Sequence, residues 1–303
     1  MRHSIFLPMG FGHEFAGVEP VAAFEALTDL TVAGDELGFD TAYVIDHLQT
    51  IPPSADPLFE CWTTVAALLR STRRIRIGQL VTANGYRNPV LQARMAATAD
   101  VIGDGRFTFG IGAGWYEPDY VLLGLPFRDA PARLRELGEA LPVLLEHKPA
   151  RIPVLIAGGG EKVTLRLVAQ YADACNVLES PEQLERKFAV LREHCERLGR
   201  PYEAIRRTSA SVCIFGDTDE EARAALPPGS EFAFPGDLAG YGLIGTPETI
   251  RRRLAAYEAA GVQELAISFG GPDPLATLRR YAAEIMRTST APSRPPAGTA
   301  ARS

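Results

Sequence analysis

Short runs of apolar and β-branched residues alternate along this chain with longer segments in which apolar residues recur about every three or four positions. The first pattern is typical of buried strands and the second of amphipathic helices. Some runs, such as Val154–Ala157, are apolar throughout, as expected where both faces of a parallel sheet are covered. We predict eight strands: Ser4–Leu7, Thr41–Ile45, Arg74–Val81, Phe107–Ile111, Pro153–Ala157, Ala174–Leu178, Arg207–Phe215 and Gln263–Phe269.

Helical patterns fill the intervals that separate these strands. Eight alternating strand and helix units predict a single-domain (β/α)8 barrel, the TIM barrel, over residues 1–287, with a doubly wound open sheet as the alternative. Residues 288–303 lack periodicity and are rich in Pro, Ser, Thr, Ala and Arg, so we predict a disordered tail there. The predicted helices are Pro20–Leu37, Pro57–Arg70, Asn88–Ile102, Ala132–Glu146, Glu161–Tyr171, Pro181–Leu198, Asp219–Leu226 with Pro247–Ala260, and Asp273–Met286.

One interval, residues 226–242, has no regular pattern and contains Phe232 and Phe234 among many glycines and prolines. Loops of this length are uncommon in a compact domain unless they have a function. The interval is therefore either a lid over a site or a surface loop whose phenylalanines cover the barrel.

Composition and charge narrow the classes of partner. The formal net charge is −6, the pI is about 5.5, and the basic residues are scattered, which argues against nucleic acid. No apolar run reaches the roughly 18 residues of a membrane span, and the N-terminus has no export pattern. A reduced, metal-free, cytoplasmic protein is expected because there are five histidines and no C-x-x-C pair among Cys61, Cys175, Cys195 and Cys213.

The segment 78–117 is the most informative part of the chain. It reads as strand, helix and strand, and its two strands open onto Asn84–Arg87 and Gly112–Glu117. Parallel sheets bind their ligands at such strand ends. Glycines that clear space, together with aromatic rings and charges, predict a site for a flat cofactor with Trp115 or Tyr116 as one wall. The alternative is that Trp115 plugs the barrel mouth.

A second glycine-rich turn follows the strand that ends at Ala157. Gly158, Gly159 and Gly160 precede Glu161, Lys162 and a helical pattern. Backbone N–H groups at the start of a helix, glycines without a Cβ and a lysine would together hold a phosphate. The spacing is not that of a P-loop, so a nucleotide triphosphatase is disfavoured. A plain tight turn is the alternative.

Asp46 and His47 follow directly on the second predicted strand, at the end where barrels carry their active sites. Asp46 is an acid that could set the tautomer of His47, and His47 could then handle a proton or contact substrate. Glu14, in the loop after the first strand, is a possible substrate contact or a solvated loop residue. No G-x-S-x-G, HExxH or paired-cysteine pattern occurs, so hydrolysis by serine or zinc has no support.

Read together, five segments resemble the luciferase-like monooxygenase superfamily, and most of all its branch that uses the deazaflavin coenzyme F420. The resemblance covers about residues 1–287 in the right order, and each segment alone would be weak. The segments are Gly38–His47, Tyr86–Pro89, Ala96–Arg106, Gly110–Glu117 and Ala157–Asn176.

The resemblance implies a (β/α)8 barrel with the deazaflavin in its C-terminal mouth and a hydride passing between ring carbon C5 and an organic substrate. A non-proline cis peptide is implied at Gln79–Leu80 or Leu80–Val81. His47 is the implied catalytic residue, with Glu117 and Glu14 as alternatives. The implied cofactor contacts are Asp46, Leu80, Val81, Thr82, Asn84, Gly112, Trp115, Tyr116, Gly158, Gly159, Gly160, Glu161 and Lys162.

Three hypotheses remain at this point. The first is an F420-dependent oxidoreductase acting on a small molecule, the second an FMNH2-dependent monooxygenase, and the third a cofactor-binding protein without catalysis. A homodimer is expected. The chain departs from the resemblance between Leu141 and Pro153, where relatives usually carry a longer stretch, and this weakens any transfer of substrate specificity.

Overall fold

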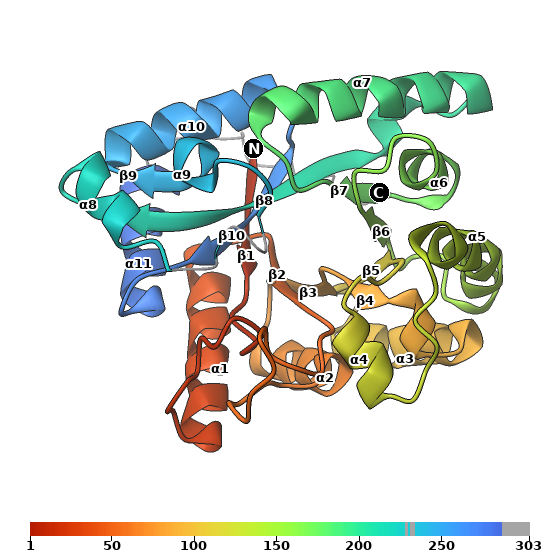
Figure 1. The fold of residues 1–303 in the computed structure, drawn as a ribbon, viewed down its shortest axis with the longest axis horizontal. Helices are drawn as coiled ribbons and strands as arrows, with labels where there is room; N and C mark the ends of the chain where they lie inside the picture. The colour runs from red at the N-terminus through yellow and green to blue at the C-terminus, as the bar shows by residue number, and fades with distance from the viewer. Residues whose placement is uncertain (228–229, 231–233, 287–303) are drawn as a thin grey trace, which may run out of the picture.

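The computed structural model describes residues 1–227, 230 and 234–286, and its centre is a closed barrel of parallel strands (Figure 1). Each strand pairs with the next, and β10 pairs with both β1 and β8, which closes the ring. This confirms the predicted TIM barrel. The barrel strands are β1 (Arg2–Phe6), β2 (Thr41–Val44), β3 (Arg76–Gln79), β5 (Phe107–Gly112), β6 (Val154–Ala157), β7 (Ala174–Asn176), β8 (Arg206–Phe215) and β10 (Glu264–Phe269).

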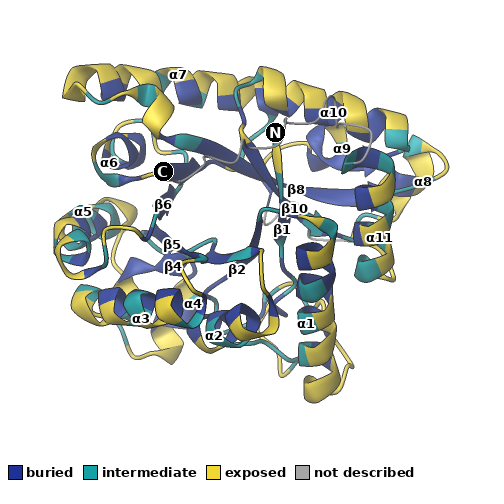
Figure 2. Cartoon of the chain, turned by 180° about the vertical axis from the view of Figure 1, so that it is seen from behind, coloured by how far each residue is buried: buried dark blue, intermediate teal, exposed yellow. Residues whose placement is uncertain are grey.

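Helices surround the barrel, with buried residues facing the strands and exposed residues facing outward (Figure 2). No helix among the described residues is long and apolar enough to cross a membrane. The longer helices are α1 (Pro20–Leu37), α2 (Cys61–Ser71), α3 (Pro89–Ile102), α5 (Ala130–His147), α6 (Thr164–Tyr171), α7 (Pro181–Leu198), α10 (Pro247–Ala259) and α11 (Pro274–Tyr281). Shorter elements are β4 (Thr82–Ala83), α4 (Glu117–Leu122), α8 (Asp219–Ala224), α9 (Leu238–Tyr241), β9 (Leu243–Gly245), the 3₁₀ turns Asn84–Tyr86 and Tyr202–Ala204, and the π-helical turn Ala282–Met286.

Several boundaries differ from the sequence prediction. The predicted strand Arg74–Val81 corresponds to β3 alone, which ends at Gln79. A cis peptide bond between Leu80 and Val81 follows it, and β4 begins at Thr82, beyond the predicted end. Helix α2 begins at Cys61 instead of Pro57 because Glu60 caps it, its carboxylate accepting a hydrogen bond from the N–H of Thr63 at 2.7 Å. Helix α6 begins at Thr164, so the predicted start at Glu161 was wrong.

Besides the 3₁₀ turns, four short elements were not expected from the sequence: β4, α4, α9 and β9. The irregular interval 226–242 contains α9 and leads directly into β9, which pairs with β8. Phe234 is buried in the core, as the covering-loop interpretation expects, whereas Phe232 lies outside the described residues. The predicted disordered tail, 288–303, also lies outside them.

A buried carboxylate ties α1 to the start of β3. Asp35 accepts hydrogen bonds from the backbone N–H groups of Ile75 at 2.6 Å, Arg74 at 2.8 Å and Arg73 at 3.0 Å. Burial alone would raise the pKa of Asp35, but these N–H groups outweigh it and the pKa is lowered. The ionised form is therefore the one that stabilises the fold.

We expect Asp35→Asn to lower the free energy of unfolding by about 1–3 kcal/mol at neutral pH, because the amide loses a charged acceptor for these N–H groups. The contribution of Asp35 is complete above its unfolded pKa, about 3.9, and is lost as the pH falls through the lower pKa of the folded state. Urea unfolding of both proteins at pH 7 and near pH 3 measures this. Asp29→Asn, on the exposed face of the same helix, is the matched control. A difference as large at pH 3 as at pH 7 would contradict the assignment.

Candidate active site

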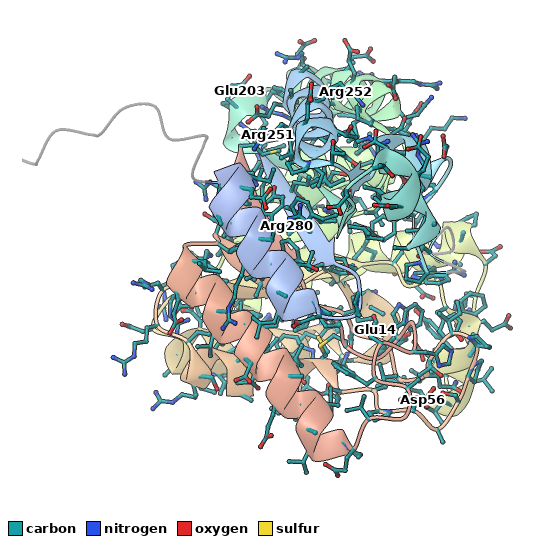
Figure 3. The ribbon with its side chains drawn as sticks, turned by 90° about the vertical axis from the view of Figure 1, so that its left-hand side faces the viewer. Glu14, Asp56, Glu203, Arg251, Arg252 and Arg280 are labelled. Carbon is teal, nitrogen blue, oxygen red and sulfur yellow. The ribbon has the colours of Figure 1, made fainter. Side chains whose placement is uncertain are left out.

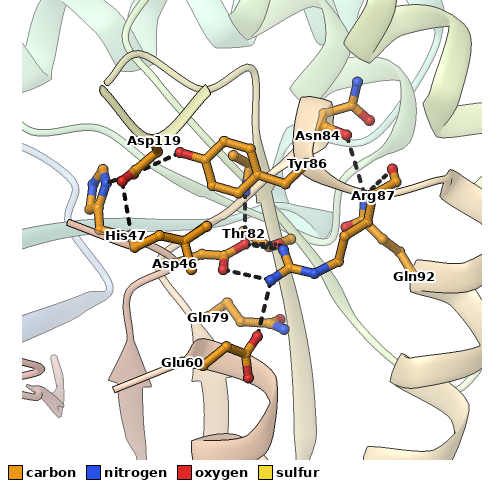
Figure 4. Close-up of polar contacts among 12 residues, drawn as sticks. Asp46, His47, Glu60, Gln79, Thr82, Asn84, Tyr86, Arg87, Gln92 and Asp119 are labelled. Carbon is orange, nitrogen blue, oxygen red and sulfur yellow. Dashed lines mark hydrogen bonds and ion pairs between the residues drawn. The ribbon is translucent and has the colours of Figure 1, made fainter. Parts of the chain in front are cut away.

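An imidazole–carboxylate pair lies at the carboxyl ends of the barrel strands. His47 follows β2, and its Nδ1 lies 2.8 Å from Oδ2 of Asp119, which is on α4 (Figure 4). Asp119 is fully buried, whereas the His47 side chain keeps 14% of its surface exposed. The pair therefore has an inner carboxylate and an imidazole that solvent or a ligand can reach.

Asp119 accepts four hydrogen bonds. Oδ1 accepts from the backbone N–H groups of Leu48 and Gln49, both at 3.0 Å, and Oδ2 accepts from the Tyr86 hydroxyl at 2.8 Å as well as from His47. The two backbone N–H groups and the Tyr86 hydroxyl donate to Asp119 whichever tautomer His47 adopts, and they stabilise its carboxylate form. We therefore assign the proton between Asp119 and His47 to Nδ1. Nε2 is then free to accept a proton, or to donate one from the imidazolium form.

Tyr86 reinforces this arrangement. Burial raises the pKa of its hydroxyl, and the hydrogen bond to Asp119 raises it further. The hydroxyl consequently stays protonated and serves as a permanent donor to Asp119.

Aromatic side chains enclose the imidazole. Phe11, from the loop after β1, stacks on His47 with ring centroids 4.0 Å apart and an interplanar angle of 13°. Trp115 and Tyr116 approach it edge-on at 5.5 Å each. Trp115 is 51% exposed, and Tyr116 is buried with its hydroxyl donating to Thr50 O at 2.9 Å. Tyr116 is thus a fixed wall, and Trp115 leaves an apolar face open.

The sequence analysis supposed that Asp46 could set the tautomer of His47. That was wrong, because the Asp46 carboxylate bonds to other residues. Its carboxylate is buried and forms a two-point ion pair with Arg87, at 2.6 and 3.0 Å, and accepts from Thr82 Oγ1 at 2.5 Å. Arg87 also pairs with Glu60 at 3.0 Å. These contacts join the exit of β2 to β4 and to α2, so they fix the strand end that carries His47.

The strand exit beside the site has the non-proline cis peptide that the resemblance implied, and it is Leu80–Val81. A Cβ on Gly110 would lie 1.9 Å from Gln79 O, and one on Gly112 would lie 2.9 Å from a Val81 methyl. The space that these glycines leave is therefore filled by the neighbouring strand, and not by a ring as the sequence analysis had supposed. Asn84 Oδ1 is buried without a hydrogen-bond partner among the described residues.

The two alternative acids lie apart from the His47 pair. Glu117 is exposed in the first turn of α4, and its carboxylate forms no hydrogen bond or ion pair with the described residues. Figure 3 shows Glu14 on the loop after β1, where its carboxylate accepts from its own loop at Gly12 N, 2.9 Å away. Desolvation by the surrounding protein raises the pKa of Glu14, although solvent still reaches the side chain.

The glycine turn after β6 presents a row of unpaired donors. Gly158 N donates to Asn176 O, but within the described part of the chain the N–H groups of residues 159–163 have no acceptor. Gly158 has a φ of +128°, which favours glycine, and a Cβ on Gly160 would lie 2.8 Å from Thr164 Oγ1, so a side chain there would need the Thr164 hydroxyl to move. Lys162 is exposed, whereas the Glu161 carboxylate is paired with Lys187 at 3.0 Å.

Sequence reasoning missed Asp119, Tyr86, Phe11 and Lys187. Asp119 had a usable signal, because Pro118 and two acids mark the first turn of a helix directly after a strand exit. Tyr86 lies in a strand exit that the sequence analysis did single out. Phe11 and Lys187 had no such signal, since each reaches the site only through the packing of a loop or helix distant in sequence.

Comparison with known families shows which family this chain belongs to. The family model described as luciferase-like monooxygenase matches residues 1–236. The chain belongs to this family.

Individual members of this family differ in chemistry. The F420-dependent glucose-6-phosphate dehydrogenase of Microbacterium testaceum is 30% identical over 178 residues, which are 58% of this chain and 49% of the relative, about half its length. The 5,10-methylenetetrahydromethanopterin reductase of Archaeoglobus fulgidus is 25% identical over 83% of this chain and 75% of its own.

Among solved structures, a monooxygenase from Streptomyces bottropensis superposes with a TM-score of 0.77 at 18% identity, covering 96% of this chain and all of the other. At that identity, the likeness shows the shared barrel alone. The named relatives are oxidoreductases or monooxygenases, which supports an enzyme.

Proposed function

We propose that this protein is an oxidoreductase that transfers a hydride between the deazaflavin F420 and a small organic substrate. The observation that carries the proposal is the His47–Asp119 pair, an oriented proton-handling group at the ligand-binding end of the barrel. The F420-dependent dehydrogenase relative supports the choice of cofactor.

The residues present fit such a cofactor. The unpaired N–H groups of residues 159–163, with Lys162 beside them, suit a phosphate on the cofactor chain. The half-buried Leu80 and Val81, together with the exposed face of Trp115, suit a flat ring at the mouth.

When bound, the deazaflavin supplies a ring carbon that gives or accepts a hydride. A carbonyl that gains a hydride also gains one proton, and an alcohol that loses a hydride loses one. His47 Nε2 is the group placed to donate or accept that proton, and Asp119 keeps the imidazole oriented and balances the imidazolium charge. Phe11 and Tyr116 restrict the access of water to one face and one edge of the His47 imidazole ring.

Monooxygenation with reduced FMN is the second candidate. It is favoured by the luciferase-like monooxygenase family to which the chain belongs and by a phosphate site that would serve FMN equally well. The third candidate is a protein that binds the cofactor without catalysis. The oriented His47–Asp119 pair argues against this candidate.

Fluorescence titration of the cofactor-free protein with F420 and, separately, with FMN distinguishes these candidates. We expect F420 to bind with micromolar or tighter affinity and FMN to bind at least about tenfold more weakly, a difference of about 1.4 kcal/mol. Selective FMN binding with oxygen uptake would favour monooxygenation. Binding of neither cofactor would refute the proposal, and F420 binding without turnover across enones, imines, aldehydes and alcohols would favour the third candidate.

A further inference from the structure

Three side chains of α7 converge on a single residue of the glycine turn, Glu161. Lys187 Nζ lies 3.0 Å from its Oε1, and Arg186 Nε lies 3.2 Å from the same oxygen. His194 Nε2 lies 2.7 Å from the backbone carbonyl of Glu161. Helix α7 therefore holds both the main chain and the side chain of this residue.

These contacts form at the place where the turn has no secondary structure of its own. Helix α6 begins only at Thr164, and the N–H groups of residues 159–163 lack acceptors in the described chain. The backbone carbonyls of the turn accept from α6 at its two ends, Gly160 O from Leu165 N at 3.0 Å and Val163 O from Leu167 N at 2.9 Å. Glycines also cost more conformational entropy to order than other residues. The contacts with α7 add to these bonds and fix the middle of the turn, at Glu161.

Lys187 and His194 are built into the structure instead of lying on its surface. The Lys187 side chain is 16% exposed, and its Cε would lie 3.7 Å from a Cβ on Gly159, in ordinary van der Waals contact. His194 is buried, with 8% of its surface exposed. The hydrogen bond from Lys187, followed by that from Arg186, lowers the pKa of Glu161, so the carboxylate is ionised at neutral pH.

We propose that Lys187 and His194 are positioning residues which, acting through Glu161, hold the N–H groups of residues 159–163 in the arrangement that binds a phosphate. Glu161 is then an anchor and not a cofactor ligand, which leaves Lys162 as the free cation of the turn. The inference rests on the proposed function only in taking that phosphate to be the one in F420.

The test compares two ligands that are alike up to the phosphate and differ from the phosphate outward. F420 carries it, and the deazaflavin riboside, with the same ring and ribityl chain, does not. We expect Glu161→Gln and Lys187→Met each to weaken F420 binding by about fivefold to tenfold. The double variant should bind F420 no more weakly than the weaker-binding single variant, because both substitutions break the same Glu161–Lys187 interaction. Riboside affinity should change less than about twofold, and kcat at saturating F420 should be retained.

Matched variants separate positioning from general damage to α7. Glu193→Gln breaks the Glu193–Arg197 pair on the same helix, 2.9 Å apart, and should leave both affinities unchanged. His194→Gln retains a side-chain N–H donor and should keep the F420 affinity better than His194→Ala. The thermal midpoint of each variant shows whether it remains folded.

Three binding results would overturn the inference. Equal loss of F420 and riboside affinity would mean that α7 acts on the whole site, and stronger F420 binding by Glu161→Gln would mean that Glu161 competes with the phosphate. Unchanged F420 binding in all variants would also refute it.

If no variant and no wild-type sample binds F420, the proposed function fails and inorganic phosphate decides the inference. Broadening of the phosphate ³¹P resonance by the wild type but not by Lys187→Met would support the inference. The absence of broadening by the wild type would refute it.

Discussion

Replacing His47 by alanine is expected to lower kcat by about 10²- to 10⁴-fold while changing cofactor affinity by less than about threefold. The imidazole is the oriented proton-handling group of the site, and its Nδ1 is already committed to Asp119. Removing it takes away the proton donor or acceptor for the substrate but leaves the glycine turn and the Leu80–Val81 strand exit intact. Steady-state kinetics with a titration of the same cofactor measures both quantities.

His147→Ala is the control for this variant, because His147 is exposed on α5 and its imidazole bonds to Val143 O of its own helix. It should leave turnover and affinity unchanged. If His47→Ala lowered cofactor affinity as much as turnover, His47 would be a cofactor contact or a structural residue, and the proton-transfer role would be withdrawn.

Asp119→Asn is expected to lower kcat by about 10²- to 10³-fold and the free energy of unfolding by about 1–3 kcal/mol. The carboxylate faces four donors, and an amide offers one acceptor oxygen and places an NH2 group against the remaining donors. His47 would then lose the partner that keeps the proton on Nδ1. Kinetics and urea unfolding of the same sample separate the two effects.

Glu117→Gln is the matched control, since Glu117 lies two residues earlier in the same helical turn but is exposed. We expect it to retain wild-type turnover and stability. Equal losses of turnover for Glu117→Gln and Asp119→Asn would shift the catalytic role toward the exposed acid.

The barrel could be predicted from local patterns because its elements are specified locally. A strand buried on both faces requires a continuous apolar run such as Val154–Ala157, and a helix on the outside requires apolar residues on one side. Helix ends were predictable where a side chain caps them without help from elsewhere, as Thr246 does for α10. The start of α6 was predicted three residues too early in the chain. Glu161 resembles a residue of a helical first turn in sequence, but α7 holds it outside the helix.

The same contrast holds within the site. Strand exits identified His47, Trp115 and Tyr116, since barrel geometry brings the carboxyl ends of all strands to one side. The partner of His47 could not be identified in this way. Asp46 is its neighbour in sequence, but both residues lie beyond the end of β2, and Asp46 turns toward Arg87.

By itself, the sequence determined the alternation of strands and helices, the strand ends that form the mouth, and the two glycine-rich turns, because periodicity and backbone freedom are properties of neighbouring residues. Tertiary structure alone decided that Asp119 orients His47, that Phe11 covers it, and that Lys187 and His194 anchor Glu161. Those contacts join residues separated by tens of positions, and their geometry exists only once the barrel closes and the helices pack around it.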